Sequence, residues 1–235
     1  MKDIIIIPTY NEKDNIAELI KDIFNIVPDV SVLVVDDNSP DGTAEIVQRL
    51  KTDFPNLNLF SRSKKEGLGK AYLNVFGEIL KNNNIRKVVI MDGDLSHDPR
   101  YLKEHFRMSN QSEVVIGSRY VSGGKTIGWE FWRRALSRFA SFYCRLITKM
   151  PIRDCTSGFM TIDFNFLRKI DFSSIDLSGY AFLIELKYVL WQNGASLKEI
   201  PIIFKNRTGG ESKISNHIIT EGIIAPWKMR FKKRT

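Results

Sequence analysis

Short runs of β-branched and aliphatic residues alternate with helical patterns through the first half of the chain. Four runs predict strands, because each is too short for a helix and ends in polar turn residues: 3–10, 30–37, 56–62 and 86–94. Three amphipathic stretches predict the helices between them: 11–27, 43–54 with Thr43 as its cap, and 69–83. Strands that alternate with helices form βαβ units, so the fold class is α/β with a mostly parallel sheet flanked by helices.

Polar and acidic residues collect where three of these strands end. The segments are PTYNE at 8–12, DDNSPDG at 36–42 and DGDLSHD at 92–98. Ligands of parallel sheets bind beyond the carboxyl ends of the strands, so these segments predict a binding crevice. Surface turns are also polar for unrelated reasons, and the three segments together favour a site more strongly than any one of them does.

Asp92 and Asp94 are the residues of this edge with the most specific chemistry. Alternate residues that leave a strand face the same way, so two carboxylates separated by Gly93 can converge on one ion. Two carboxylates with few other ligands suit Mg²⁺ or Mn²⁺, with water and diphosphate oxygens in the remaining positions. The alternative is a solvated acidic turn. Asp98, which precedes Pro99, is interpreted as a turn or helix cap.

Charge and composition narrow the class of protein. The 235 residues carry a net charge of +8, which favours an anionic partner: nucleic acid, phosphorylated small molecules or an acidic membrane surface. Cys144 and Cys155 are too few for a disulfide framework, which favours a reducing compartment such as the cytosol. We find no signal-peptide pattern, and no run approaches the roughly 18 to 20 apolar residues that span a bilayer. We therefore expect a soluble or peripheral protein.

Two stretches of the second half combine apolar stripes with basic residues. The first has apolar residues at Trp132, Leu136, Phe139, Tyr143, Ile147 and Met150, and basic ones at Arg134, Arg138, Arg145 and Lys149. The second carries Ile218, Ile219, Ile223, Ile224 and Trp227, followed by Lys228, Arg230, Lys232, Lys233 and Arg234. Both patterns predict amphipathic helices at a membrane interface, where anionic headgroups add about 1 kcal/mol per nearby basic residue. A helix packed on the core gives the same pattern, and this alternative stays open.

The three strand-end motifs, in this order and spacing, resemble those of the inverting glycosyltransferases of family 2, which have the GT-A fold. Four further motifs extend the resemblance over nearly the whole chain to the dolichol- or polyprenol-phosphate mannose synthases. They are GSRYVSGG at 117–124, GWEFWRRALSRFASFYCRL at 128–146, IRDCTSGFM at 152–160 and NRTGGESK at 206–213. The resemblance implies a metal-dependent transfer of mannose from GDP-mannose to the phosphate of a polyisoprenol lipid, giving polyprenyl phosphate β-mannose.

The resemblance also assigns roles to residues of this chain. Donor binding would involve Pro8, Tyr10, Glu12, Val35, Asp37, Asp92, Gly93, Asp94, Arg119, Arg207 and Lys213. The acceptor phosphate would be bound by Arg119, Arg133 and Ser137, and the catalytic residues would be Asp92, Asp94 and Arg119. Asp94 would be the principal ligand of Mg²⁺ or Mn²⁺, with Asp92 sharing it. Related enzymes can have a Gln two places after the second Asp; this chain has Ser96 there, so Ser96 or water would complete the metal shell.

Residue chemistry agrees with parts of this assignment. Arg133 and Ser137 are four residues apart on an expected helix, so they can offer one phosphate a guanidinium and a hydroxyl. The segment from Arg207 to Lys213 is basic and contains two glycines, which suits a loop that closes over a diphosphate; a plain polar turn is the alternative. No residue is indicated as a general base. None is required, because a phosphate monoester with a second pKa of about 6 is already largely ionised at pH 7.

The same resemblance divides the chain into two halves of one catalytic domain. Residues 1–117 would bind the nucleotide sugar, and residues 118–235 would bind the acceptor and carry the amphipathic helices. The enzyme would then be peripheral on the cytoplasmic face of a membrane, with a separate membrane subunit as a further partner and no nucleic acid. Alternatives are UDP-glucose as donor, a soluble sugar acceptor, a catalytically inactive sugar-nucleotide sensor, and a basic nucleic-acid-binding α/β protein.

Overall fold

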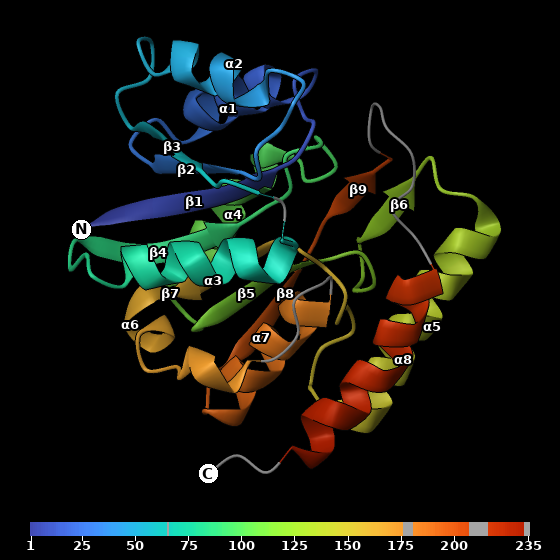
Figure 1. Cartoon of the computed structure of the whole chain (residues 1–235). Helices are drawn as coiled ribbons and strands as arrows, with labels where there is room; N and C mark the ends of the chain where they lie inside the picture. Colours follow the sequence, from blue (N-terminus) through green and yellow to red (C-terminus); the bar gives the residue numbers. More distant parts are fainter. Residues whose placement is uncertain (65, 176–180, 207–215, 233–235) are drawn as a thin grey trace.

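The computed structural model describes residues 1–64, 66–175, 181–206 and 216–232 (Figure 1). Its centre is a seven-stranded sheet with the order β3-β2-β1-β4-β7-β5-β8. The strands are β1 (Lys2–Thr9), β2 (Ser31–Asp36), β3 (Leu57–Ser61), β4 (Ile85–Ile90), β5 (Val114–Ser118), β7 (Met160–Asp163) and β8 (Leu197–Pro201). All neighbouring strands are parallel except β7, which runs antiparallel to both β4 and β5. The predicted α/β class with a mostly parallel sheet is confirmed.

Helices cover both faces of the sheet and bury two apolar layers. They are α1 (Ile16–Ile26), α2 (Thr43–Leu50), α3 (Leu68–Ile79), α4 (Leu102–Met108), α6 (Phe164–Leu167) and α7 (Ala181–Gln192), with short 3₁₀ turns at Pro99–Tyr101 and Phe172–Ser174. Along β1, Ile5 and Ile7 join the layer that contains α1, while Ile4 and Ile6 join the layer that contains α3 and α7. This alternation follows from the two-residue period of a strand buried on both faces.

Helix α2 begins differently from its prediction. Thr43 was expected to be the cap, but the cap is Gly42, which has a left-handed φ of 92°, and Thr43 is the first helical residue. The Asp41 carboxylate accepts from the backbone N–H of Thr43 and from its hydroxyl, at 3.0 and 2.6 Å. The Asp98 prediction is confirmed, since its side chain accepts from the N–H of Arg100 and caps the 3₁₀ turn at Pro99–Tyr101.

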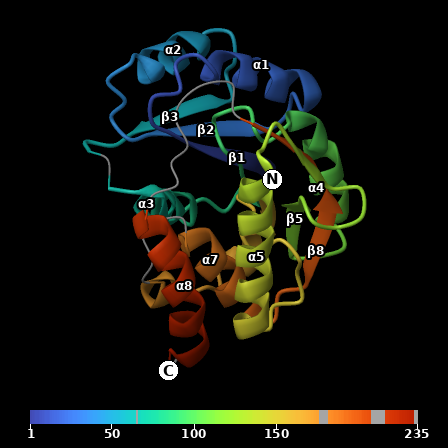
Figure 2. The same cartoon turned by 90° about the vertical axis from the view of Figure 1, so that its right-hand side faces the viewer.

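A second layer of structure, formed by the second half of the chain, lies beside the sheet. The short parallel strands β6 (Lys125–Ile127) and β9 (Ile203–Lys205) pair with each other, and Ile202 separates β9 from β8. The helices α5 (Phe131–Thr148) and α8 (Asn216–Phe231) lie side by side (Figure 2). The Tyr143 hydroxyl of α5 donates to the Ile223 carbonyl of α8 at 3.0 Å and accepts from Trp227 Nε1 at 2.8 Å.

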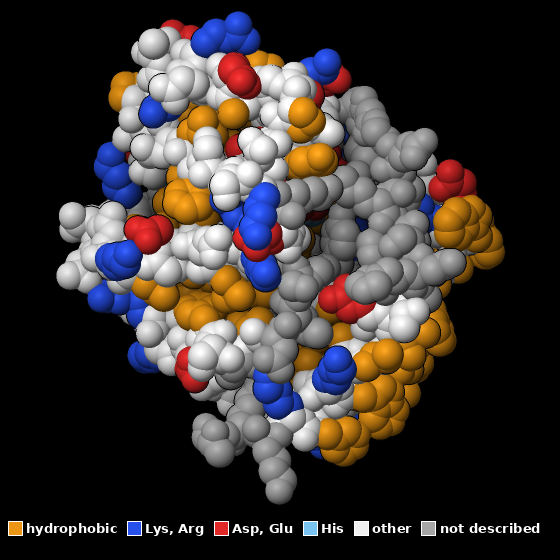
Figure 3. All heavy atoms as spheres, viewed as in Figure 1, with side chains coloured by type: hydrophobic (Ala, Val, Ile, Leu, Met, Phe, Trp, Pro, Cys, Tyr) orange, Lys and Arg blue, Asp and Glu red, His pale blue; other side chains and the backbone are white. Residues whose placement is uncertain are grey.

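The outer sides of α5 and α8 expose large apolar side chains, seen along the right edge of Figure 3 over α5. We call this set the α5–α8 apolar surface: Phe131, Trp132, Leu136, Phe139, Phe142, Leu146, Ile223, Ile224, Trp227 and Phe231. The predicted stripe of α5 is only partly correct, because Ile147 and Met150 are buried in the core whereas Phe142 and Leu146 are exposed. In the described residues, no helix is long and apolar enough to cross a membrane.

Candidate active site

Hydrogen bonds join the loop after β1 to the loop after β2, and the two loops form one edge of the candidate site. The Thr9 hydroxyl donates to Asp36 Oδ1 at 3.0 Å, and the Ser39 hydroxyl and N–H donate to the same carboxylate at 2.6 and 2.8 Å. The N–H of Asn11 then donates to the Ser39 hydroxyl at 3.0 Å. Asp36, the last residue of β2, is fully buried, and its carboxylate links the end of β1 to the loop after β2.

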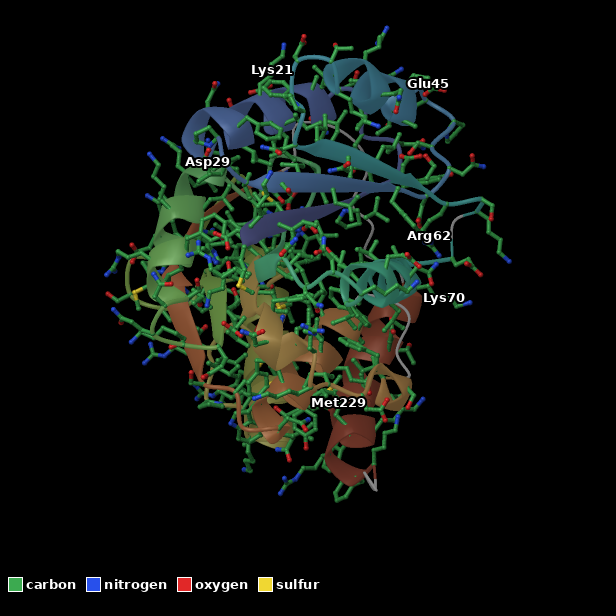
Figure 4. All side chains as sticks on the ribbon, turned by 90° about the vertical axis from the view of Figure 1, so that its left-hand side faces the viewer. Lys21, Asp29, Glu45, Arg62, Lys70 and Met229 are labelled. Atoms are coloured by element: carbon green, nitrogen blue, oxygen red, sulfur yellow. The ribbon has the colours of Figure 1, made fainter. Side chains whose placement is uncertain are left out.

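Asp37 is the acid that the resemblance to family 2 assigned to the nucleotide. It is bonded to Arg62, a buried residue that follows β3 and lies at the edge where β2 and β3 end (Figure 4). Arg62 also contacts the Glu66 carboxylate at 3.1 Å. Sequence reasoning missed Arg62, although it follows a predicted strand at the same edge as the acidic loops. Its guanidinium fixes the direction of Asp37 through a charge-assisted hydrogen bond.

The other donor residues predicted in the first half lie around the same edge. Pro8 is half-buried near the end of β1, Tyr10 and Glu12 are half-buried in the loop that follows, and Val35 is buried near the end of β2. The N–H of Glu12 donates to the Thr43 hydroxyl at 3.0 Å, which ties this loop to the start of α2. The structure therefore brings together the strand-end segments that the sequence analysis grouped.

Asp92, Gly93 and Asp94 lie in the turn after β4, not on the strand, which ends at Ile90. The Asp92 side chain is 37% exposed, whereas Asp94 is buried. A Cβ at Gly93 would lie 3.2 Å from Thr9 Cγ2, so the turn packs tightly against β1. The Ser96 hydroxyl and N–H both donate to Asp94 Oδ1, at 2.5 and 3.1 Å. Through these two hydrogen bonds, Ser96 holds the Asp94 carboxylate in its orientation.

His97 has a direct structural relation to the same turn. It is fully buried, and its Nδ1 accepts from the backbone N–H of Asp92 at 2.9 Å. The ring stacks on Phe159 at 5.0 Å and meets the edge of Phe204 at 5.4 Å. Burial lowers the pKa of His97, which keeps the imidazole neutral and Nδ1 available as an acceptor. Sequence reasoning gave His97 no role, because nothing local shows which atom it contacts.

Arg119 is placed by a buried ion pair. Its Nε and Nη2 donate to the two oxygens of Asp154 at 2.8 and 2.7 Å, and Nη2 also donates to the Thr156 hydroxyl at 2.7 Å. Burial opposes the charge of Arg119, but Asp154 outweighs it and the net pKa is raised. A Cβ at Gly124 would lie 2.5 Å from the Ser118 carbonyl oxygen, so the loop after Arg119 needs this glycine.

Trp129 connects Arg119 to the predicted acceptor residues. The Arg119 guanidinium lies 5.6 Å from the Trp129 ring centroid, and that of Arg133 lies 4.4 Å from it. Two guanidinium groups therefore lie against one indole; Asp154 pairs with Arg119, and Arg133 adds a second cation that suits phosphate binding. Ser137, one turn further along α5, accepts from the Tyr120 hydroxyl at 2.6 Å. The predicted residues Arg207 and Lys213 fall outside the described residues.

The chemistry of the Asp92 and Asp94 side chains fits a hard divalent cation. Both offer carboxylate oxygens, the ligands that Mg²⁺ and Mn²⁺ prefer. Within the part of the chain that the structure describes, no group of three or more His, Cys, Asp or Glu side chains is placed to hold a metal. A cation at this turn would therefore need oxygens from water and from a bound diphosphate.

A sequence model described as Glycosyl transferase family 2 matches residues 4–171. The chain belongs to glycosyltransferase family 2. This family 2 glycosyltransferase is 37% identical over 233 residues to the polyprenol monophosphomannose synthase of Mycolicibacterium smegmatis, covering 97% of this chain and 88% of the relative. It is 35% identical over 224 residues to the undecaprenyl-phosphate mannosyltransferase of Micrococcus luteus, covering 95% of this chain and 92% of the relative.

Solved structures show the same fold. A glucosyl-3-phosphoglycerate synthase from Mycobacterium tuberculosis, in complex with Mn²⁺, UDP and glucosyl-3-phosphoglycerate, superposes with a TM-score of 0.68 at 15% identity, over 100% of this chain and 81% of that one. A mannosyltransferase from Pyrobaculum calidifontis, in complex with GDP-mannose and Mn²⁺, gives 0.64 at 16% identity, over 100% of this glycosyltransferase and 65% of that chain. The predicted GT-A-like fold is thereby confirmed.

Proposed function

We propose that this glycosyltransferase moves mannose from GDP-mannose to the phosphate of a polyisoprenol lipid, giving polyprenyl phosphate β-mannose. The observation that carries the proposal is its near full-length similarity to two relatives named for mannose transfer to polyprenyl phosphates. The Pyrobaculum calidifontis mannosyltransferase shares the fold of this chain, and its structure contains GDP-mannose, the donor that we propose. Membership in a glycosyltransferase family favours an enzyme over a nucleic-acid-binding protein.

The donor would lie over the carboxyl ends of β1, β2 and β4. Pro8, Tyr10 and Glu12, with Val35 and Asp37, would contact the nucleotide. Asp92 and Asp94 would hold Mg²⁺ or Mn²⁺ and the donor diphosphate, and the cation would supply charge that stabilises the leaving GDP. His97 and Ser96 would keep this turn in place through the N–H of Asp92 and the carboxylate of Asp94. We also propose Arg207 and Lys213 as partners of the diphosphate.

The acceptor phosphate would approach from the side of α5. Arg119, Arg133 and Ser137 would bind it, and Asp154 keeps the Arg119 guanidinium fixed for this purpose. The phosphate is already ionised near pH 7, so attack on the sugar C1 needs alignment rather than a general base. A single in-line displacement inverts the anomeric configuration, which predicts a β-linked product from the α-linked donor.

The α5–α8 apolar surface would rest on the membrane that carries the acceptor. Ten large apolar side chains from two adjacent helices are exposed there, and exposed apolar side chains gathered in this way are typical of a surface that meets a membrane. This supports a peripheral position on a membrane; the cytoplasmic face, with or without a separate membrane subunit, is part of our proposal. The surface can be tested with Phe139→Ser and Trp227→Ser, which should weaken binding to vesicles without changing metal-dependent GDP binding.

The decisive experiment compares donors and acceptors directly. The purified chain is incubated with GDP-mannose or UDP-glucose, Mg²⁺ or Mn²⁺, and either polyprenyl phosphate or a soluble sugar. We expect a mannolipid only from GDP-mannose and polyprenyl phosphate, with β configuration by NMR. A glucolipid formed only from UDP-glucose, or transfer only to the soluble sugar, would overturn the proposal. Donor binding without turnover under all conditions would indicate a sensor.

A further inference from the structure

A cluster of three arginines lies on and just after α5, beside Tyr120, whose hydroxyl donates to Ser137 of the proposed acceptor site. Arg138, Arg145 and Arg153 line a shallow cavity of about 330 Å³ together with Tyr120 and Phe142. We call it the arginine pocket. Arg138, Phe142 and Arg145 follow at intervals of four and three residues, so they share one face of the helix. Arg153 enters from the segment that follows α5.

The guanidinium groups of the arginine pocket form no ion pair with a carboxylate of the described residues. No carboxylate lines the cavity, and no ion pair of the described residues includes any of its three arginines. Two acids lie beside Arg153 without pairing with its guanidinium: Asp154 binds Arg119, and Glu199 accepts from the backbone N–H groups of Arg153 and Asp154. Three exposed guanidinium groups around one hollow therefore favour an anion that accepts several hydrogen bonds, and a phosphate group fits this best.

The position of the pocket indicates where that phosphate comes from. Phe142 belongs both to the pocket and to the α5–α8 apolar surface, where Phe139 and Leu146 are its neighbours on the helix. Tyr143, by contrast, faces α8 through its two hydrogen bonds. The arginines thus border the exposed apolar side chains of α5 on the side away from α8. A basic border beside an apolar face matches a lipid whose headgroup is anionic and whose chains are apolar.

We propose that the arginine pocket binds the headgroup phosphate of an anionic phospholipid in the membrane that carries the acceptor. The proposal rests on the proposed function only in that it needs the enzyme to work at a membrane. Binding here would fix the rotation of α5 on the membrane and so orient Arg133 and Ser137, which the same helix carries, toward lipid-borne phosphates. The Tyr120 ring also helps to position Arg138, whose guanidinium lies 5.7 Å from the ring centroid.

The test compares two triple variants with the same change of net charge. One is Arg138→Gln, Arg145→Gln, Arg153→Gln. The matched control is Lys21→Gln, Arg49→Gln, Lys51→Gln. Lys21 lies on α1 (labelled in Figure 4), Arg49 lies on α2, and Lys51 directly follows α2. Each is sedimented with vesicles of phosphatidylcholine alone or with added phosphatidylglycerol, without polyprenyl phosphate. We expect the pocket variant to bind the anionic vesicles about one hundredfold more weakly than the wild type, and the control to stay near it.

Several results would overturn the proposal. They are wild-type vesicle binding by the pocket variant, an equal loss in both triple variants, or tight binding of inorganic phosphate alone by calorimetry. The pocket would instead be assigned to nucleic acid if the pocket variant bound vesicles like the wild type but no longer bound a single-stranded oligonucleotide. Metal-dependent GDP binding reports that each variant is folded. Mannose transfer to detergent-solubilised polyprenyl phosphate is measured separately, so a failure of the proposed function is distinguished from a failure of lipid binding.

Discussion

The backbone N–H of Asp92 donates to Nδ1 of His97 over 2.9 Å, with the imidazole fully buried between aromatic rings. This bond fixes the turn that carries both carboxylates. His97 acts through the position of Asp92, since the structure places no part of its ring at the surface. Two substitutions of His97 can distinguish hydrogen bonding from packing, because one removes the acceptor atom and keeps a flat ring, and the other keeps an acceptor atom and removes the ring.

His97→Phe keeps a flat ring against Phe159 but leaves the Asp92 N–H without its acceptor. A buried donor without a partner costs about 1 to 3 kcal/mol, so we expect transfer to fall by about tenfold or more and the apparent affinity for Mn²⁺ to weaken. His97→Asn places an oxygen near the site of Nδ1 and should recover part of both. Steady-state kinetics over a metal titration measures this, and equal kinetics in His97→Phe and the wild type would contradict it.

Asp94→Ala should abolish transfer and metal-dependent GDP binding, because it removes the proposed principal metal ligand. The matched control is Asp98→Asn, four residues further on, whose side chain instead caps a 3₁₀ turn and pairs with Arg100. We expect the control to retain most of its activity. Product formation and GDP binding are measured with and without Mn²⁺. An active, metal-independent Asp94→Ala enzyme would remove Asp94 from the metal site.

Asp154→Asn should destabilise the fold, because it leaves the buried Arg119 guanidinium without its counter-charge. Breaking a buried pair in this way costs about 3 to 5 kcal/mol. The exposed pair of Glu104 and Arg107 provides the control, and Glu104→Gln should change stability by less than about 1 kcal/mol. Urea unfolding at one pH gives both values. A similar decrease in the free energy of unfolding in the two variants would show that the buried pair of Asp154 and Arg119 stabilises the fold no more than an exposed pair does.

Acid should weaken the fold through His105. This buried residue stacks on Phe159 at 4.1 Å and contacts the Thr161 hydroxyl at 3.0 Å, and burial lowers its pKa to about 3. The unfolded chain takes up the proton near pH 6.5 while the folded chain does not, so stability falls as the pH drops below 6.5. The loss is about 2 kcal/mol between pH 6.5 and 5.

His105→Phe isolates this effect, since it keeps the stacking and removes the titration. Urea unfolding at pH 6.5 and at pH 5 should show a pH dependence smaller in the variant by about 2 kcal/mol. The pKa of His97 is lowered in the same direction, so some acid sensitivity should remain in the variant. An unchanged pH dependence in His105→Phe would assign the acid sensitivity to other groups.

Local patterns in the sequence were sufficient for several features. The strand and helix order of the first half, the cap at Asp98 and the gathering of acidic loops at one sheet edge were all predicted. Each depends on residues close in sequence, whose periodicity and turn chemistry act before any distant contact forms. Residue type and spacing indicated Asp92 and Asp94 as candidate ligands, the resemblance to family 2 assigned them the metal, and the structure places both in the turn after β4.

Tertiary structure decided the rest, because it depends on contacts between residues far apart in the chain. The antiparallel strand β7 enters between β4 and β5. Asp154 reaches Arg119 across 35 positions, and Arg62 reaches Asp37 across 25. The amphipathic stripe of α5 was divided by the surface it meets: Ile147 packs into the core, while Trp132 and Phe139 stay exposed. A helical period shows which residues share a face, but only the packed fold determines whether that face meets the core, solvent or a membrane.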